Sequence, residues 1–118
     1  MTATAFRSDR CGDLTRADLG REVRLGGWVH RRRDLGGLVF IDLRDRAGLV
    51  QLSCNPAWTP PEMMERAAAA GTETVILARG TVQLRPEPSR DLALGSREVE
   101  VHLTWLEIVG PAQTPVIP

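Results

Sequence analysis

Hydrophobic and polar residues alternate along several short segments of the chain, with the period of two that a half-buried strand requires. In the segment LVFIDLR, the apolar residues Val39, Ile41 and Leu43 fall on one side. Clusters of Gly, Pro, Asp and Arg separate this segment from similar ones before and after it. The pattern therefore predicts five strands, over residues 22–30, 38–44, 49–54, 72–84 and 97–109.

One helix is expected between the third and fourth of these strands, in the sequence TPPEMMERAAAAG. Thr59 is a good capping residue, Pro60 suits the first helical position, and Glu62 would complete a capping box. Gly71 marks the expected end of the helix. A short helical turn is also expected in DLTRADLG, where Gly20 would stop it before the first strand.

Five strands with a helix between the third and fourth predict an all-β fold, a five-stranded Greek-key OB-fold barrel. The strand count alone would also fit an SH3-like barrel, and the position of the helix favours the OB-fold. We assign residues 1–109 to this domain, because 118 residues suit a single core. Residues 110–118 contain three prolines and are expected to be a linker toward a further domain.

The strand alternation predicts an unusual outer surface on the second and third strands. Phe40 and Asp42 point away from the predicted core, and so does Gln51 on the next strand. If DRAG forms a four-residue loop, Asp42 lies opposite Gln51, and Phe40 lies diagonally across from it. RRRDLGG is expected to be an arginine-rich loop beside this surface.

These residue types together suit an unstacked RNA base. An aromatic ring offers a stacking face, worth about 1–3 kcal/mol per base, and an amide can pair with a base edge. Glu100, outward on the fifth strand, could accept hydrogen bonds from guanine. Residues 24–46 hold six arginines against three aspartates, although the whole chain has no net charge. All the basic residues are arginines, which pair with phosphate or stack on bases.

A simpler interpretation is available for each of these residues. An outward phenylalanine is often covered by a loop, and RRR is often a solvated turn. Gln51 is compatible with an ordinary surface position, and the role of Glu100 could be limited to an ion pair with Arg97 or another arginine. The tryptophans are assigned to packing, with Trp58 at the base of the helix. The case for nucleic-acid binding is that Phe40, Gln51, Glu100 and the arginines are predicted to lie on or beside one face of the sheet.

Other functions find little support in the sequence. The two histidines and two cysteines lack metal-ligand spacing, and no catalytic constellation is visible. DLGG lacks the lysine of a phosphate-binding loop. The chain has neither a run of membrane-spanning length nor the hydrophobic core of a signal sequence, so we expect a cytoplasmic protein with reduced thiols.

The stretch GWVHRRRDLGGLVFIDLRDRAGLVQL closely resembles the N-terminal anticodon-binding domain of bacterial-type aspartyl-tRNA synthetase, a class II enzyme. The shared pattern is GWV-x-RRRDLGG-x-x-F-x-D-x-RD-x-x-G-x-x-Q, which is long and specific. The resemblance extends more weakly from CGDL to the TPVIP tail. It implies an OB-fold that binds tRNA, here the aspartate tRNA, through the anticodon loop.

The resemblance also implies roles for individual residues. Phe40 would stack on the central anticodon uridine, Gln51 would read an anticodon base, and Glu100 would contact a base for which guanine is the sensible candidate. Arg33 lies in the anticodon contact region, and Arg31 is a reasonable phosphate or base contact. Some relatives place asparagines near the anticodon in the loop RPEPSRDLALGS. Ser89 is the nearest polar substitute here, and no contact is assigned to it.

The family's catalytic domain, with its ATP and Mg²⁺ sites, is absent from this sequence, so no cofactor is expected in this chain. The parent enzyme would be a homodimer. Whether asparagine tRNA is also accepted stays open. The alternatives are a module of an asparaginyl- or lysyl-type synthetase, or a general OB domain for single-stranded nucleic acid or protein.

Overall fold

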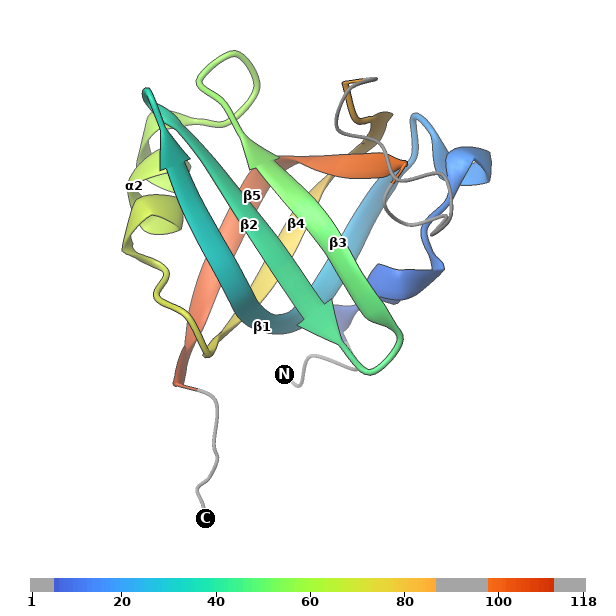
Figure 1. The fold of residues 1–118 in the computed structure, drawn as a ribbon, viewed down its shortest axis with the longest axis horizontal. Coiled ribbons are helices and arrows are strands. Elements are labelled where there is room, and N and C mark those ends of the chain that lie inside the picture. The colour runs from blue at the N-terminus through green and yellow to red at the C-terminus, as the bar shows by residue number, and fades with distance from the viewer. Residues whose placement is uncertain (1–5, 87–97, 112–118) are drawn as a thin grey trace.

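The computed structural model describes residues 6–86 and 98–111, and its elements follow the predicted order (Figure 1). The strands are β1 (Glu22–Leu35), β2 (Leu38–Asp45), β3 (Gly48–Cys54), β4 (Thr74–Leu84) and β5 (Val99–Pro111). Helix α2 (Pro61–Ala69) connects β3 to β4, and two 3-10 helices, η1 (Cys11–Asp13) and η2 (Arg16–Asp18), precede β1. The predicted order of five strands and one intervening helix is confirmed.

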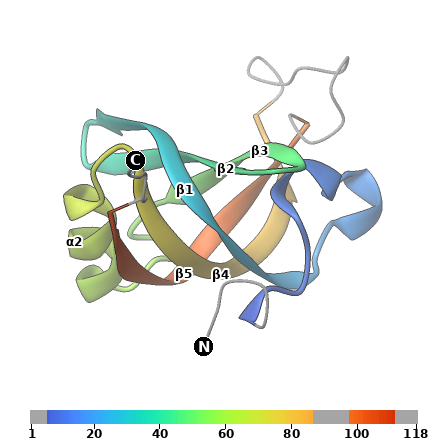
Figure 2. The ribbon, with the colours of Figure 1, turned by 90° about the horizontal axis from the view of Figure 1, so that it is seen from below.

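The strands close into a barrel in the order β1-β2-β3-β5-β4. Neighbouring strands are antiparallel except β3 and β5, which pair in parallel. Strand β1 bends so that residues 22–28 pair with β4 and residues 28–35 pair mostly with β2. Figures 1 and 2 show α2 on one side of the barrel and the N-terminal 3-10 helices on the opposite side. This arrangement is the predicted OB-fold.

The barrel interior is filled by aliphatic side chains from alternate strand positions. On β2 and β3 these are the residues that the sequence pattern placed inside, Val39, Ile41, Leu43, Val50 and Leu52, all buried. The register between β2 and β3 is also as predicted, since Asp42 pairs with Gln51. The turn between them is tighter than the expected loop, because β2 continues to Asp45 and β3 begins at Gly48.

The arginine run is strand and not loop, which corrects one prediction. Strand β1 continues through Leu35, and only Gly36 and Gly37 form the turn to β2. Both glycines have positive φ, 56° and 89°, a combination that suits a tight two-residue hairpin. The three arginines are therefore held at defined strand positions, and their side chains alternate between the two faces.

A β-bulge in β1 determines which face each arginine uses. The register with β2 shifts between Val29, which pairs with Leu43, and Arg31, which pairs with Asp42. The bulge inserts one extra residue, His30, and so reverses the side-chain alternation beyond it. Arg31 and Arg33 consequently share the outer face of β2, while Arg32 turns away and its Nη1 donates to the Ala70 carbonyl oxygen at 2.7 Å.

The predicted cap of the helix is wrong. Helix α2 has Pro60 at its N-cap position and no side-chain capping bond. The Thr59 hydroxyl instead donates to the Leu103 carbonyl oxygen on β5 at 2.6 Å and accepts the Asn55 N–H at 3.2 Å. The Thr59 hydroxyl, which the local pattern assigned to the helix cap, is therefore used in a buried tertiary hydrogen bond.

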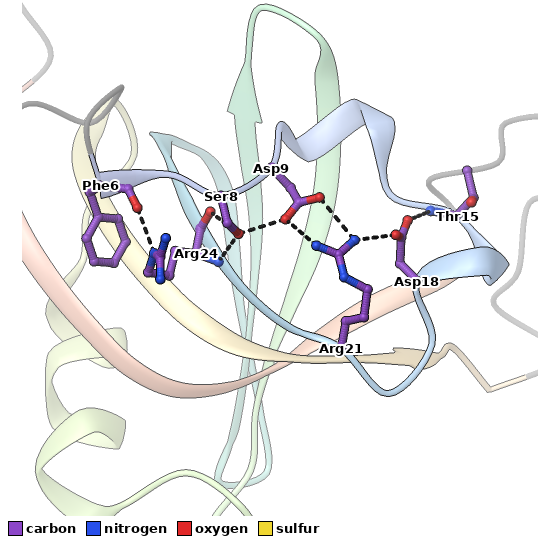
Figure 3. Close-up of polar contacts among 7 residues, drawn as sticks. All are labelled: Phe6, Ser8, Asp9, Thr15, Asp18, Arg21 and Arg24. Atoms are coloured by element: carbon purple, nitrogen blue, oxygen red, sulfur yellow. Dashed lines mark hydrogen bonds and ion pairs between the residues drawn. The ribbon is translucent and has the colours of Figure 1, made fainter.

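The N-terminal segment is fastened to the barrel by polar contacts (Figure 3). Arg21 bridges Asp9 and Asp18, and the Asp18 carboxylate also accepts the Thr15 N–H at 2.9 Å. This backbone hydrogen bond is the main reason that the pKa of Asp18 lies below its usual value, with Arg21 contributing. Thr15 and Asp18 form a capping box for η2, so the helical turn expected before β1 is present as this 3-10 helix.

The two cysteines are free and buried. Burial raises the pKa of the Cys54 thiol to about 12 and raises that of Cys11 further, where Asp45 adds to the effect. Both thiols are therefore protonated at neutral pH and serve as small apolar core groups.

Candidate nucleic-acid interface

A continuous row of polar contacts crosses the outer face of β1, β2, β3 and β5. The Arg33 guanidinium carbon lies 5.6 Å from the centre of the Phe40 ring. Arg33 Nη2 donates to Gln51 Oε1 at 2.8 Å, and Gln51 Nε2 donates to Glu100 Oε1 at 2.9 Å. Glu100 Oε2 in turn lies 2.9 Å from His102 Nε2. Four of the five predicted site residues are thus joined through direct contacts.

Strand pairing brings these residues together. Arg33 pairs with Phe40 across β1 and β2, and Gln51 pairs with Glu100 across β3 and β5. Phe40 pairs with Ser53, which leaves it diagonal to Gln51 as the sequence predicted. All these side chains occupy one face because the strand period and the bulge in β1 place them there.

Phe40 borders a concave site. The cavity beside it has a volume of about 430 Å³, large enough for a planar ring. Its lining combines apolar side chains with hydrogen-bonding groups and includes Leu35, Leu38, Phe40, Trp58, Gln51 and Glu100. Phe40 is only partly buried, so the alternative of a fully covered phenylalanine does not apply. A base that enters this cavity would meet an aromatic ring and an amide on adjacent strands.

Gln51 and Glu100 are more buried than a polar outer surface would suggest. Their exposed fractions are 7% and 5%. The Gln51 amide is fully oriented, because its oxygen accepts from Arg33 and its nitrogen donates to Glu100. The expectation of an ordinary surface glutamine is therefore incorrect. A buried amide with both ends bonded presents one fixed donor–acceptor pattern to a ligand.

Glu100 divides its carboxylate between two partners. One oxygen accepts from Gln51 and the other faces His102. The suggested partner Arg97 lies outside the described residues, as does Ser89. Both carboxylate oxygens of Glu100 thus have partners within the described part of the chain, which offsets the cost of burying its charge.

Trp58 and His102 belong to this site, although the sequence analysis assigned neither to it. Their rings stack with centroids 3.7 Å apart and planes 4° from parallel. The Trp58 indole N–H also donates to the Ser53 carbonyl oxygen at 2.9 Å. The strand alternation shared by Glu100 and His102 could have indicated His102. Trp58 lies in a turn, where no periodicity indicates its direction.

Arg31 lies on an adjoining cavity of about 310 Å³, which His30, Asp42 and Arg85 also line. Arg31 is exposed, whereas Arg33 and Gln51 border both cavities. The Nε of Arg33 is buried and has no hydrogen-bond partner within residues 6–86 and 98–111. The two cavities therefore form one surface, with a basic rim around Gln51.

Within the same described residues, no group of three or more metal-ligating side chains is present. No described helix is both long and apolar enough to cross a membrane. The face that carries Phe40 and Gln51 presents an aromatic ring, an oriented amide and guanidinium groups, a set of chemical groups suited to single-stranded nucleic acid.

Comparison with known proteins agrees with this chemistry. A family model named for the tRNA anticodon and described as an OB-fold nucleic acid binding domain matches residues 23–109. The chain belongs to this family. The matched residues of this OB-fold nucleic acid binding domain run from the first buried residue of β1 to the exposed end of β5.

Individual relatives point to one group of enzymes. The OB-fold domain is 49% identical over 113 residues to the aspartate–tRNA(Asp/Asn) ligase of Moorella thermoacetica and 41% identical over 109 residues to the aspartate–tRNA ligase of Staphylococcus aureus strain Newman. These alignments cover 96% and 92% of this chain but 18% of each relative. The chain thus spans less than a fifth of the length of the curated relatives it matches.

A solved structure shows a similar fold. The asparaginyl-tRNA synthetase from Pyrococcus horikoshii, complexed with asparaginyl-adenylate, superposes with a TM-score of 0.73 at 26% identity, covering 93% of this chain and 24% of that one. The barrel is therefore similar to one in an asparaginyl-tRNA synthetase, while the sequence identity to the two aspartate ligases is higher.

Proposed function

We propose that this chain is the anticodon-reading module of an aspartate–tRNA ligase. The observation that carries the proposal is the row Phe40, Arg33, Gln51 and Glu100, held by consecutive contacts beside a cavity of about 430 Å³. Identities of 41–49% to aspartate–tRNA ligases support the choice of parent enzyme.

Phe40 stacks on the central uridine of the anticodon in this proposal. The Arg33 guanidinium lies near the same ring, so the base meets an aromatic face with a cation beside it. Stacking on one aromatic side chain contributes about 1–3 kcal/mol per base. Because stacking distinguishes bases poorly, the selection has to come from the neighbouring polar groups.

Gln51 and Glu100 supply that selection. In the free protein the Gln51 amide is bonded at both ends, so a base that pairs with it exchanges one of those bonds for its own. A base with the wrong edge leaves Arg33 or Glu100 without a partner, which costs about 1–3 kcal/mol for each buried group left unpaired. Glu100 accepts hydrogen bonds from the N–H groups of guanine. Uracil and cytosine do not have N–H donors at matching positions.

Arg31 holds the RNA backbone, and Arg33 lies on the same cavity beside it. Arg31 is exposed on the rim of the second cavity, where a phosphate can reach it without desolvating a buried charge. Such contacts make binding depend on salt but add little base selectivity. Backbone and base contacts are thus divided between the rim and the floor of one surface.

The other properties of the parent enzyme follow by the same proposal. Aspartylation, with its ATP and Mg²⁺, takes place outside these 118 residues, in a homodimeric enzyme of the cytoplasm. In this proposal the 118-residue module binds no cofactor and forms no covalent bond. Its contribution is to bind the correct tRNA and orient it.

The anticodon sequence determines which tRNA the chain would bind. Aspartate and asparagine anticodons share guanine and the central uracil and differ in the last base. The Moorella relative is named for both tRNAs and the Staphylococcus relative for one. We propose that aspartate tRNA is bound, and the last base tests whether asparagine tRNA is bound as well.

Competition binding tests this function directly. Short anticodon stem-loops carrying the aspartate anticodon, with each base changed in turn, compete against a labelled aspartate stem-loop. We expect the guanine and central uracil changes to weaken competition at least tenfold. Equal competition by all the loops and by oligo-dT would show a general single-strand binder, and preference for a lysine anticodon would assign a lysyl-type module.

A further inference from the structure

A second basic cavity lies away from Phe40, where β1 bends beside the N-terminal segment. Its volume is about 550 Å³. Arg7 and Arg10 reach it from the segment before η1, and Arg46 reaches it from the β2–β3 turn. Trp28 and the two glycines before it on β1 also line the cavity, together with Asp45 and Val75. The residues that line it belong to neither of the cavities of the candidate site.

None of the ion pairs among residues 6–86 and 98–111 includes these three guanidinium groups. The carboxylate in this cavity, Asp45, is already used, because its oxygens accept the backbone N–H groups of Cys11 at 2.8 Å and Ala47 at 2.9 Å. Asp45 is also 7% exposed and so faces the protein more than the cavity. In a chain with no net charge, this cavity therefore holds a local excess of positive charge.

Several arginines elsewhere on the surface are paired. Arg16 contacts Glu98, Arg21 contacts Asp9 and Asp18, and Arg79 lies 4.0 Å from Glu22. Unpaired arginines that converge from two chain segments on one cavity are suited to an external anion. The planar fork of arginine matches phosphate oxygens, and the partly exposed Trp28 ring adds a flat surface beside them.

The position of the cavity fits the RNA of the proposed function better than an unrelated anion. Strand β2 connects the two sites, with Phe40 near its start and Asp45 at its end. At about 3.3 Å per residue, these positions are roughly 17 Å apart along the strand. A hairpin whose loop sits on Phe40 has paired backbone at such a distance. The exposed Arg44, which pairs with Trp28 across β1 and β2, lies between the two sites.

We propose that the cavity formed by Arg7, Arg10, Arg46 and Trp28 is a second RNA contact, which binds backbone phosphates of the paired stem next to the anticodon loop. This inference rests on the proposed function, because it needs the loop to be seated at Phe40. It assigns the loop bases to one cavity and the stem phosphates to another. The cavity adds affinity and orientation without reading sequence.

The double variant R10A/R46A tests the proposal. Both side chains are exposed, so their removal leaves the core intact. Arg16→Ala with Arg79→Ala is a control with the same change in charge. We expect R10A/R46A to weaken binding of the aspartate stem-loop by at least tenfold at low salt. We also expect it to reduce the slope of log affinity against log salt by about one to two, since each lost phosphate contact removes roughly 0.7–0.9. The control should retain most of the stem-loop affinity and most of the salt slope.

The loop sequence alone, as a single strand without its stem, separates this inference from the proposed function. R10A/R46A should bind that strand as the unchanged protein does, whereas Phe40→Ala should bind both RNAs poorly. Equal stem-loop affinity for R10A/R46A and its control would overturn the stem contact while leaving anticodon reading intact. Competition by poly-glutamate as strong as that by the stem duplex would also overturn it, and would assign the cavity to an acidic polypeptide.

Discussion

Gln51 on β3 and Glu100 on β5 are direct partners in the parallel strand pair of the barrel, and the amide nitrogen of one donates to the carboxylate of the other at 2.9 Å. The two residues are 49 positions apart in the sequence. Closure of the barrel joins them and so completes the row that begins at Phe40.

Replacing Phe40 with alanine should weaken binding of the aspartate stem-loop by about 1–3 kcal/mol, because one stacked base loses its aromatic partner. Phe40 is only partly buried, so the fold should survive. Fluorescence anisotropy with labelled RNA measures the affinity. Ile108→Ala is the control, since it removes an exposed apolar side chain from the far end of β5. Equal affinity for the two variants would contradict the stacking role.

Replacing Gln51 with alanine should lower base selectivity more than it lowers overall affinity, because arginine–phosphate contacts are retained. It should also destabilise the fold by about 1–3 kcal/mol, since Arg33 and buried Glu100 each lose a partner. Gln83→Ala is the matched control, because Gln83 also pairs with Glu100 in register but is exposed. Unchanged ratios of affinity among loops with altered anticodon bases would show that Gln51 does not read a base.

Substitutions at Thr59 test whether its side chain caps the helix or makes a tertiary hydrogen bond. Aspartate is a good capping residue but its carboxylate cannot donate to the Leu103 carbonyl oxygen. We therefore expect Thr59→Asp to lower the free energy of unfolding by about 1–3 kcal/mol or more, and Thr59→Ser to retain most of it. Urea denaturation measures both. A Thr59→Asp protein as stable as the original would restore the capping interpretation.

The buried thiols should make stability fall at alkaline pH. In the unfolded chain Cys54 ionises near 9.0, whereas burial raises its pKa to about 12 in the fold. Below pH 9 the thiol is protonated in both states and the full stability is present. As the pH rises above 9, only the unfolded state loses the proton, so the free energy of unfolding decreases.

The composition makes this measurement specific, because the chain contains no lysine and no tyrosine. Urea unfolding at several values above pH 9 should show the decrease, and the variant C11A/C54A should show it much less. The matched comparison is the same variant near neutral pH, where only the cost of the smaller side chains remains. An equal alkaline decrease in both proteins would mean that the thiols are not the cause.

Local alternation of side chains was enough to predict five strands, the order of the elements and the face that carries Phe40 and Gln51, although it ended the first strand at residue 30, before the arginine run. Neighbouring strands joined by a short turn have their register set by the turn, so the pairing of Asp42 with Gln51 followed from the sequence. The long motif around the arginines also indicated the family. Each of these properties depends on residues close together in the chain.

The bulge at His30 could not be read in this way, and it moves Arg31 and Arg33 to the outer face. The stack of Trp58 on His102, the tertiary bond of Thr59 and the burial of Glu100 were missed as well. All of these contacts depend on how distant strands meet when the barrel closes. A periodic pattern specifies on which side of its own strand a residue lies, but the neighbours across a parallel pair are set by the packing of the whole barrel.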